Sequence, residues 1–381
     1  MQDRTRVPST PSLQQHATRA AFFMPGFAIA AWAPLVPFAK ARAGLDEAML
    51  GMVLLCLGAG SLLAMPMAGA LAARQGCRRV MLAAMLAACA ALPVLAIAPN
   101  AVVLGLALFV FGAAIGAMDC TMNLQAVVVE RESGRALMSG FHAFYSIGGF
   151  AGAAAMTALL SAGAVPVWAC VAAVVVVLAL VGVAFRHWRG ERVDSDVPAF
   201  AWPRGIVLLV GVVCFVMFLA EGAMLDWGAV FLDQAKDMDP ARAGLGYVAF
   251  SLAMTVARLT GDGVVQAVGA MRAVVAGALV AFAGFAVIVL APGVTVALLG
   301  FVLVGIGCAN IVPVMFTAAG RQTAMPESLA IPAISTLGYA GVLAGPALIG
   351  FVAHGTSLQF AFWCLAFSVL GVALATRWLR V

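Results

Sequence analysis

Twelve apolar stretches, each long enough to cross a lipid bilayer as a helix, follow one another along the 381-residue chain. The apolar core of a bilayer is about 30 Å thick, and a helix needs about 20 residues to cross it. Short polar breaks separate the stretches. The expected helices cover residues 20–39, 49–72, 80–98, 102–127, 138–162, 165–185, 205–232, 244–266, 272–291, 294–318, 328–353 and 357–377. The sequence therefore predicts an all-α integral membrane protein with about twelve transmembrane helices.

The composition excludes an ordinary soluble fold. Hydrophobic residues make up 64% of the chain and charged residues 10%, with a mean hydropathy of +1.09, whereas a soluble domain is about half apolar and a quarter charged. The eight cysteines show neither the spacing of a zinc site nor that of a disulfide framework, so we expect buried, unreactive thiols. We expect no metal, no cofactor and no cleaved signal peptide, and we expect the protein to act as a monomer.

One polar break is longer than the others and divides the chain into two sets of six apolar stretches. It covers residues 186–204. The sequence thus predicts an N-terminal tail over residues 1–19, a first six-helix bundle over 20–185, a central loop over 186–204 and a second bundle over 205–381. Breaks elsewhere are too short for a further domain.

Basic residues predict how the chain is oriented, because Lys and Arg accumulate in the cytoplasmic loops of membrane proteins. Sixteen of the 21 Lys and Arg residues lie in the two termini and in the breaks that share their side. The opposite breaks hold four, which are Lys40, Arg42, Lys236 and Arg242. Arg258 is assigned to the inner end of the eighth helix. This distribution places both termini and the central loop in the cytoplasm of a bacterial inner-membrane protein, and it explains the net charge of +5 without a nucleic-acid partner.

The two halves resemble each other, which indicates an internal repeat. Three features recur in the same order: the 19-residue spacing of Trp32 to Gly51 and of Trp227 to Gly246, the glycines Gly76 and Gly269 before basic residues, and Gly116–Asp119 beside Gly307–Asn310. Two parallel six-helix repeats with a solute site at the midplane between them are one of the layouts of secondary transporters.

The break between the second and third helices carries a motif of the major facilitator superfamily, which the whole chain resembles. The segment reads Gly69-Ala-Leu-Ala-Ala73-Arg74-Gln-Gly76-Cys-Arg78-Arg79, similar to the superfamily pattern G-x-L-a-D-R-x-G-R-R. The resemblance implies the major facilitator fold, with Gly69, Arg74 and Arg78 acting in gating. Ala73 replaces the usual aspartate and removes the carboxylate that helps to latch the inner gate.

A second copy of this motif retains an acidic residue. It reads Arg258-Leu-Thr-Gly261-Asp262, so the charge latch is expected in the second half. Arg258 and Asp262 are spaced i, i+4, which suits a pair that closes a gate rather than a solute site.

Two further segments resemble the MosC-like branch of the superfamily, which includes YbjJ-like inner-membrane proteins. They are Glu221-Gly-Ala-Met-Leu-Asp226-Trp227 and Ser139-Gly-Phe-His142. This resemblance implies a sugar- or inositol-like solute and a similarity to fucose–proton symporters.

Several polar and aromatic residues lie inside the apolar stretches, where an ionisable group is costly and therefore marks a function or a partner. The candidate solute- and proton-binding residues are Asp119, Asn123, His142, Glu221, Asp226, Asn310, Trp32 and Trp227. Asp119 and Asn123 share one helix face. By the resemblance, helices 1, 4, 7 and 10 line the central cavity, and all of these residues except His142 lie on that set.

Six of these candidates also have a structural interpretation. Asp119 and Glu221 would then be hydrogen-bonding groups between helices, and His142 a packing residue or a partner of Asp119. Asp226 would be a partly solvated acid at the outer mouth. Trp32 and Trp227 would be aromatic residues of the outer interface.

The favoured function is proton-coupled symport of a small polar solute by alternating access. The solute is expected to be neutral or cationic, because no Lys or Arg is assigned to the middle of an apolar stretch. Asp119 and Glu221 would be the coupling and binding pair, with His142 tuning Asp119. The alternative is a proton-coupled multidrug or metabolite exporter of the same fold. A membrane receptor or enzyme is a distant alternative, because no nucleophile motif, metal cluster or phosphate loop is present.

Overall fold

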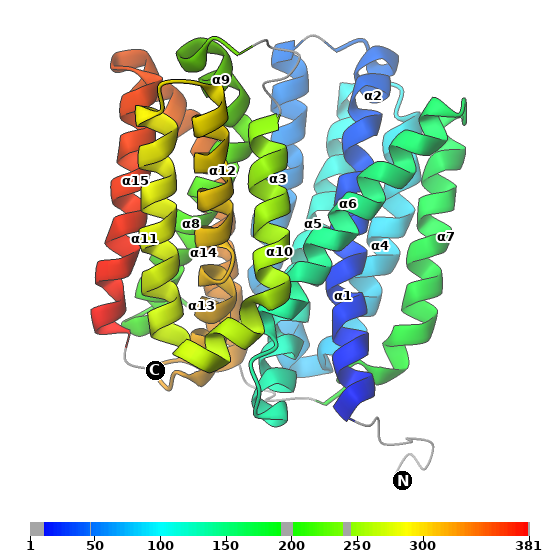
Figure 1. Cartoon of the computed structure of the whole chain (residues 1–381). Helices are drawn as coiled ribbons and strands as arrows, with labels where there is room; N and C mark the ends of the chain where they lie inside the picture. The colour runs from blue at the N-terminus through cyan, green and yellow to red at the C-terminus, as the bar shows by residue number, and fades with distance from the viewer. Residues whose placement is uncertain (1–10, 46, 192–200, 239–244, 380–381) are drawn as a thin grey trace. The chain divides into compact units, whose positions relative to one another are not determined.

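The computed structural model describes residues 11–45, 47–191, 201–238 and 245–379. Parts of the expected N-terminal tail and central loop, residues 1–10 and 192–200, lie outside the described residues. Every regular element among the described residues is a helix (Figure 1). Twelve helical segments in this described part of the chain are long and apolar enough to cross a membrane, which confirms the predicted fold class.

Contacts between Cα atoms divide the chain into two compact units, residues 1–135 with 144–199 and residues 136–143 with 200–381. The division into bundles 20–185 and 205–381 stays a prediction. The elements from the N-terminus to residue 187 are α1 (Pro11–Trp32), η1 (Ala33–Leu35), α2 (Val36–Ala43), α3 (Glu47–Gln75), α4 (Cys77–Ile97), α5 (Ala101–Ser133), α6 (Met138–Ser161), α7 (Pro166–Ala184) and η2 (Phe185–His187). The remaining elements are α8 (Ile206–Asp226), α9 (Gly228–Lys236), α10 (Leu245–Val268), α11 (Ala270–Leu290), α12 (Val294–Cys308), α13 (Ile311–Arg321), α14 (Glu327–Gly355), α15 (Leu358–Ala375) and η3 (Thr376–Trp378).

Several helices extend beyond the apolar stretches that predicted them. The first expected helix begins at residue 20, whereas α1 begins at Pro11. The fourth was expected to end at residue 127, whereas α5 continues to Ser133. Hydropathy marks only the part of a helix that matches the lipid core, while backbone hydrogen bonding continues into the polar turns at its ends.

The internal repeat is visible in the backbone of the two halves. The first spanning helix breaks directly after Trp32, and the corresponding helix of the second half breaks at Trp227, between α8 and α9. Gly76 precedes α4 with φ 84° and ψ 151°, and Gly269 precedes α11 with φ 89° and ψ 147°. Both positions therefore use a positive φ that favours glycine, and each of the helices that follow has 21 residues.

Small residues let helices of the first unit approach closely. A Cβ on Gly112 or Gly116 of α5 would collide with the α3 backbone at Leu57 or Ser61. Ser61 Oγ also donates a hydrogen bond of 2.8 Å to the Gly112 carbonyl oxygen. Close backbone approach through glycine and hydrogen bonds between helices are the usual means of helix association in lipid.

The second unit differs from the first at one position that matters for the site. Helix α5 is continuous. The corresponding span of the second unit, residues Val294–Arg321, is interrupted at Ala309 and Asn310, between α12 and α13. Pro313 follows Ala309 by four residues and has no N–H, so the Ala309 carbonyl oxygen loses its intrahelical donor. The interruption therefore provides a buried acceptor inside a spanning segment.

Candidate functional site

Asp119 and Asn123 form a buried polar group on α5 of the first unit. Asp119 is 8% exposed and Asn123 is fully buried. Asn123 Nδ2 donates a 2.9 Å hydrogen bond to the Asp119 carbonyl oxygen, one turn earlier on the same helix. Asn123 Oδ1 accepts no hydrogen bond from the described residues, and among these residues no basic side chain pairs with the Asp119 carboxylate. The group therefore presents a carboxylate without a cation beside an available acceptor.

The second unit holds an ion pair inside its spanning helices. Arg258 Nη2 of α10 lies 3.4 Å from Glu221 Oε1 of α8, with side chains 8% and 18% exposed. Arg258 Nε donates a 3.2 Å hydrogen bond to the Ala309 carbonyl oxygen, the acceptor that Pro313 leaves without an intrahelical donor. The Arg258 guanidinium thus supplies the hydrogen-bond donor that the Ala309 carbonyl oxygen lacks within its own helix, and Glu221 compensates the charge of Arg258.

The position of Arg258 corrects the sequence analysis. We assigned it to the end of its helix and expected no Lys or Arg in the middle of a spanning stretch, but it is buried ten residues before the last residue of α10. The expected helix ended at residue 266, and helical hydrogen bonding continues to Val268, because backbone groups in a bilayer need internal partners.

Asp262 accepts hydrogen bonds from the first turn of α6. Its Oδ1 accepts from the Ser139 N–H at 2.9 Å and its Oδ2 from the Gly140 N–H at 3.0 Å. These N–H groups have no intrahelical partner at a helix start, and the helix dipole favours a negative charge there. The second motif copy therefore uses its acid as a helix cap. The expected action of Arg258 with Asp262 as a gate-closing pair stays a prediction.

His142 is buried on α6, and its ring packs against Phe316 of α13 with 5.7 Å between ring centroids. Both residues belong to the second unit, whereas Asp119 belongs to the first. The hypothesis that His142 tunes Asp119 stays a prediction.

The remaining candidates lie at helix ends and breaks. Asp226 is the last residue of α8 and is exposed. Trp227 Nε1 and Asn310 Oδ1 are buried without a hydrogen-bond partner among the described residues. Trp32, at the end of α1, is 4% exposed. The structure thus leaves a buried donor at Trp227 and a buried acceptor at Asn310.

The gating motif of the first unit binds the chain that follows α7. Arg78 Nε and Nη2 donate to the carbonyl oxygens of Trp188 and Arg186, each at 2.8 Å. The Arg78 N–H donates to the Arg189 carbonyl oxygen at 2.7 Å. Arg74 is exposed and Gly69 is buried. Arg78 thus anchors residues 186–189 to the start of α4.

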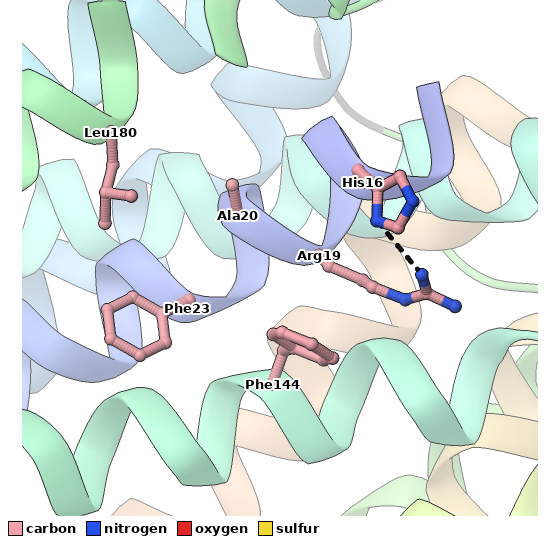
Figure 2. Close-up of a pocket in the computed structure, with 6 residues that line it drawn as sticks. All are labelled: His16, Arg19, Ala20, Phe23, Phe144 and Leu180. Atoms are coloured by element: carbon pink, nitrogen blue, oxygen red, sulfur yellow. Dashed lines mark hydrogen bonds between the residues drawn. The ribbon is translucent and has the colours of Figure 1, made fainter. Parts of the chain in front are cut away.

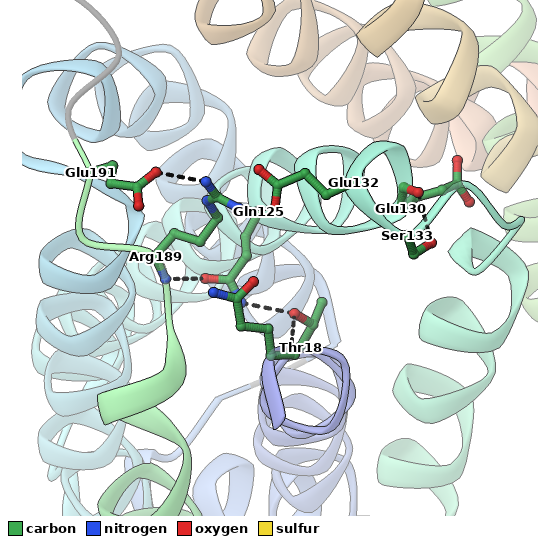
Figure 3. A network of polar contacts seen from close by, with 8 residues as sticks. Thr18, Gln125, Glu130, Glu132, Ser133, Arg189 and Glu191 are labelled. Carbon is green, nitrogen blue, oxygen red and sulfur yellow. Dashed lines mark hydrogen bonds and ion pairs between the residues drawn. The ribbon is translucent and has the colours of Figure 1, made fainter. Parts of the chain in front are cut away.

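A polar network that the sequence analysis missed extends this anchor (Figure 3). Gln125 Oε1 accepts from the Arg189 N–H at 3.0 Å, and Gln125 Nε2 donates to Thr18 Oγ1 at 2.9 Å. Arg189 also pairs with Glu132 at 2.5 Å and with Glu191 at 2.6 Å. Burial opposes the charge of Arg189, but these two carboxylates together raise its pKa above the ordinary value. A glutamine inside an apolar stretch was the available signal for this network.

Comparisons with known proteins agree with this architecture. No model of a protein family matches the chain. It is 50% identical over 365 residues to an uncharacterized MFS-type transporter of Yersinia pestis, covering 96% of this chain and 95% of that one. It is 31% identical over 361 residues to the membrane protein MosC of Rhizobium meliloti, covering 93% and 86%. The structure of the transporter FucP in its outward conformation superposes with a TM-score of 0.80 at 15% identity, covering 96% of this chain and 98% of FucP. FucP is the fucose:proton symporter of E. coli.

The match to the Yersinia transporter extends over nearly the whole of both chains, and the similarity to MosC agrees with the branch that the sequence motifs predicted. The twelve spans, the repeated helix breaks and the buried polar groups agree with the same assignment. The chain therefore belongs to the major facilitator superfamily and is a multi-pass secondary transporter, not an enzyme.

Proposed function

We propose that this transporter moves a small polar solute, sugar- or polyol-like and neutral or cationic, together with protons. It acts as a monomer by alternating access of its two halves in a bacterial inner membrane, with both termini in the cytoplasm. The observation that carries the proposal is one carboxylate inside a spanning helix of each unit, the buried Asp119 and the partly buried Glu221. The symport of fucose with protons by the structural neighbour FucP supports a polar solute.

The two carboxylates differ in their surroundings, which suggests different roles. Glu221 faces Arg258, whereas the described residues offer no basic partner to Asp119. A proton can neutralise Asp119 during the cycle without breaking an ion pair, so we assign Asp119 to proton coupling. Glu221 retains oxygen lone pairs beyond the contact with Arg258 and can accept hydrogen bonds from solute hydroxyl groups.

The acceptors Asn123 Oδ1 and Asn310 Oδ1 support the same solute class. Each is buried and unsatisfied within the described residues, and a buried unsatisfied acceptor costs free energy unless a ligand or water occupies it. A solute rich in hydroxyl groups supplies the donors that both need.

The buried Arg258 places a cation inside a spanning helix, where an anionic solute would be attracted. Its charge is compensated by Glu221, and its Nε is used by the Ala309 carbonyl oxygen. A strongly anionic solute would compete with Glu221 for the guanidinium and leave that carboxylate buried without a cation. We therefore keep the proposal of a neutral or cationic solute.

Transport in proteoliposomes with an imposed pH gradient tests the assignment. We expect Asp119→Asn to abolish proton-driven accumulation of a sugar or polyol while solute exchange continues. Glu221→Gln should weaken solute binding, and Asp233→Asn, an acid in the short helix α9, is the matched control that should transport like the wild type. Normal accumulation by both Asp119→Asn and Glu221→Gln would show that the acids are structural. Reversing the gradient separates symport from the export alternative.

A further inference from the structure

A groove of about 330 Å³ opens on the first unit between α1, α6 and α7 (Figure 2). Six residues line it: His16, Arg19, Ala20, Phe23, Phe144 and Leu180. None of these six is acidic, and two carry a basic side chain. The groove belongs to neither of the polar groups assigned to transport, because Asp119 and Asn123 do not line it.

The lining changes in character along the helices. His16 and Arg19 lie in the polar first turns of α1, where its apolar stretch begins at Ala20. Phe144 is near the start of α6, and Leu180 is four residues before the end of α7. Helix ends of a spanning protein lie at the depth of lipid headgroups. The groove thus combines a basic end at headgroup depth with an apolar wall that continues toward the acyl chains.

Arg19 is held in place and still has donors to offer. Its guanidinium lies 5.8 Å from the centre of the Phe144 ring, a cation–π distance. Its Nη1 donates to His16 Nδ1 at 3.3 Å, and this imidazole nitrogen must accept because arginine cannot. An arginine has five N–H donors, and among the described residues His16 is the one side chain that uses one of them. The remaining donors suit a phosphate group, which arginine binds in a bidentate manner.

We propose that this groove binds an anionic phospholipid, with the lipid phosphate on Arg19 and His16 and an acyl chain along Phe23, Phe144 and Leu180. Charge complementarity, the absence of acidic residues among the six that line the groove, and its depth at the ends of three spanning helices carry the proposal. Basic pockets between transmembrane helices are a recurrent form of lipid headgroup site. The proposal concerns a different part of the chain from the solute site and does not depend on the solute.

Thermal unfolding of the full-length protein in detergent, titrated with dioctanoyl phosphatidylglycerol, tests this site. We expect saturable stabilisation by this lipid and much weaker stabilisation by dioctanoyl phosphatidylcholine. Arg19→Gln should weaken the apparent affinity for phosphatidylglycerol by about fivefold, and Arg19→Lys should retain most of it because the charge remains. Arg377→Gln is the matched control, since it removes one exposed charge after α15 that does not line this groove, and it should leave the affinity unchanged.

Three results would overturn the proposal. Equal affinity of the wild type and Arg19→Gln would exclude the groove as the site. Equal stabilisation by both lipids would exclude recognition of the anionic headgroup. Stabilisation by glycerol 3-phosphate as strong as that by phosphatidylglycerol would identify a free phosphate-ester site instead of a lipid site. A variant that does not fold is replaced in the comparison by Leu180→Glu, whose added negative charge should also lower the affinity.

Discussion

The buried pair of Glu221 and Arg258 allows a quantitative test of the polar group in the second unit. Glu221→Gln removes the negative charge that faces the Arg258 guanidinium and keeps the hydrogen bond from Arg258 Nε to the Ala309 carbonyl oxygen. Arg258→Gln leaves the Glu221 carboxylate without its cation and the Ala309 carbonyl oxygen without its donor. Both single variants should therefore destabilise the protein, and Arg258→Gln should cost more because it disrupts two contacts.

The size of the effect follows from the geometry. Breaking a fully buried ion pair by removing one partner costs about 3–5 kcal/mol. The present N–O separation is 3.4 Å and the Glu221 side chain is 18% exposed, whereas a strong charge-assisted hydrogen bond is about 2.7–2.9 Å long. We therefore expect a loss of about 2–3 kcal/mol for Glu221→Gln. The double variant should lose less than the sum of the single variants by about 1–2 kcal/mol.

The test is a double-mutant cycle. Unfolding by sodium dodecyl sulfate, followed by circular dichroism, gives the free energy of unfolding of the wild type, of the two single variants and of the double variant. Glu132→Gln is the control, because the pair of Arg189 and Glu132 is 15% and 52% exposed and should contribute less than about 1 kcal/mol. Single-variant losses that add to within about 0.5 kcal/mol would show that the pair contributes no coupling, and the reasoning about Arg258 would be wrong.

Two further changes test the packing and the orientation of the chain. Gly261→Ala should destabilise the second unit by about 1–3 kcal/mol, because the added Cβ would collide with the Asn310 side chain. Gly263→Ala is the control, because its Cβ meets nothing within 4 Å, and it should leave stability unchanged or raise it. An equal loss of stability in both variants would contradict the packing argument. A cysteine at Gln234 should react with an impermeant maleimide in intact cells while one at Glu191 should not, and the reverse pattern would overturn the proposed topology.

The fold was predictable from the sequence because its main determinant is local. Each apolar stretch specifies a helix by length and hydropathy alone, so the twelve spans could be assigned without knowledge of their neighbours. The repeat was predictable as well. A position with positive φ favours glycine, so glycine occurs at the corresponding positions Gly76 and Gly269 of the two halves. Helix ends were less predictable, because polar turns such as the start of α1 carry no hydropathy signal.

The environments of the candidate residues could not be predicted in the same way. The partners of Arg258 lie 37 and 51 residues away along the chain. The partners of Asp262 lie 123 and 122 residues away, at the start of α6. Sequence spacing shows which residues share a helix face but not which helix faces them.

The interruption at Ala309 and Asn310 connects these observations in the second unit. Pro313 removes a backbone donor, the freed Ala309 carbonyl oxygen binds Arg258, and the buried guanidinium in turn requires a negative charge, which Glu221 provides. Glu221 thus compensates a charge within its own unit, in addition to the solute-binding role that we propose for it. Asp119 is under no such requirement, since the described residues provide its carboxylate with no cation. For that reason we regard Asp119 as the residue whose charge is best explained by transport, and we expect its substitution to affect coupling far more than stability.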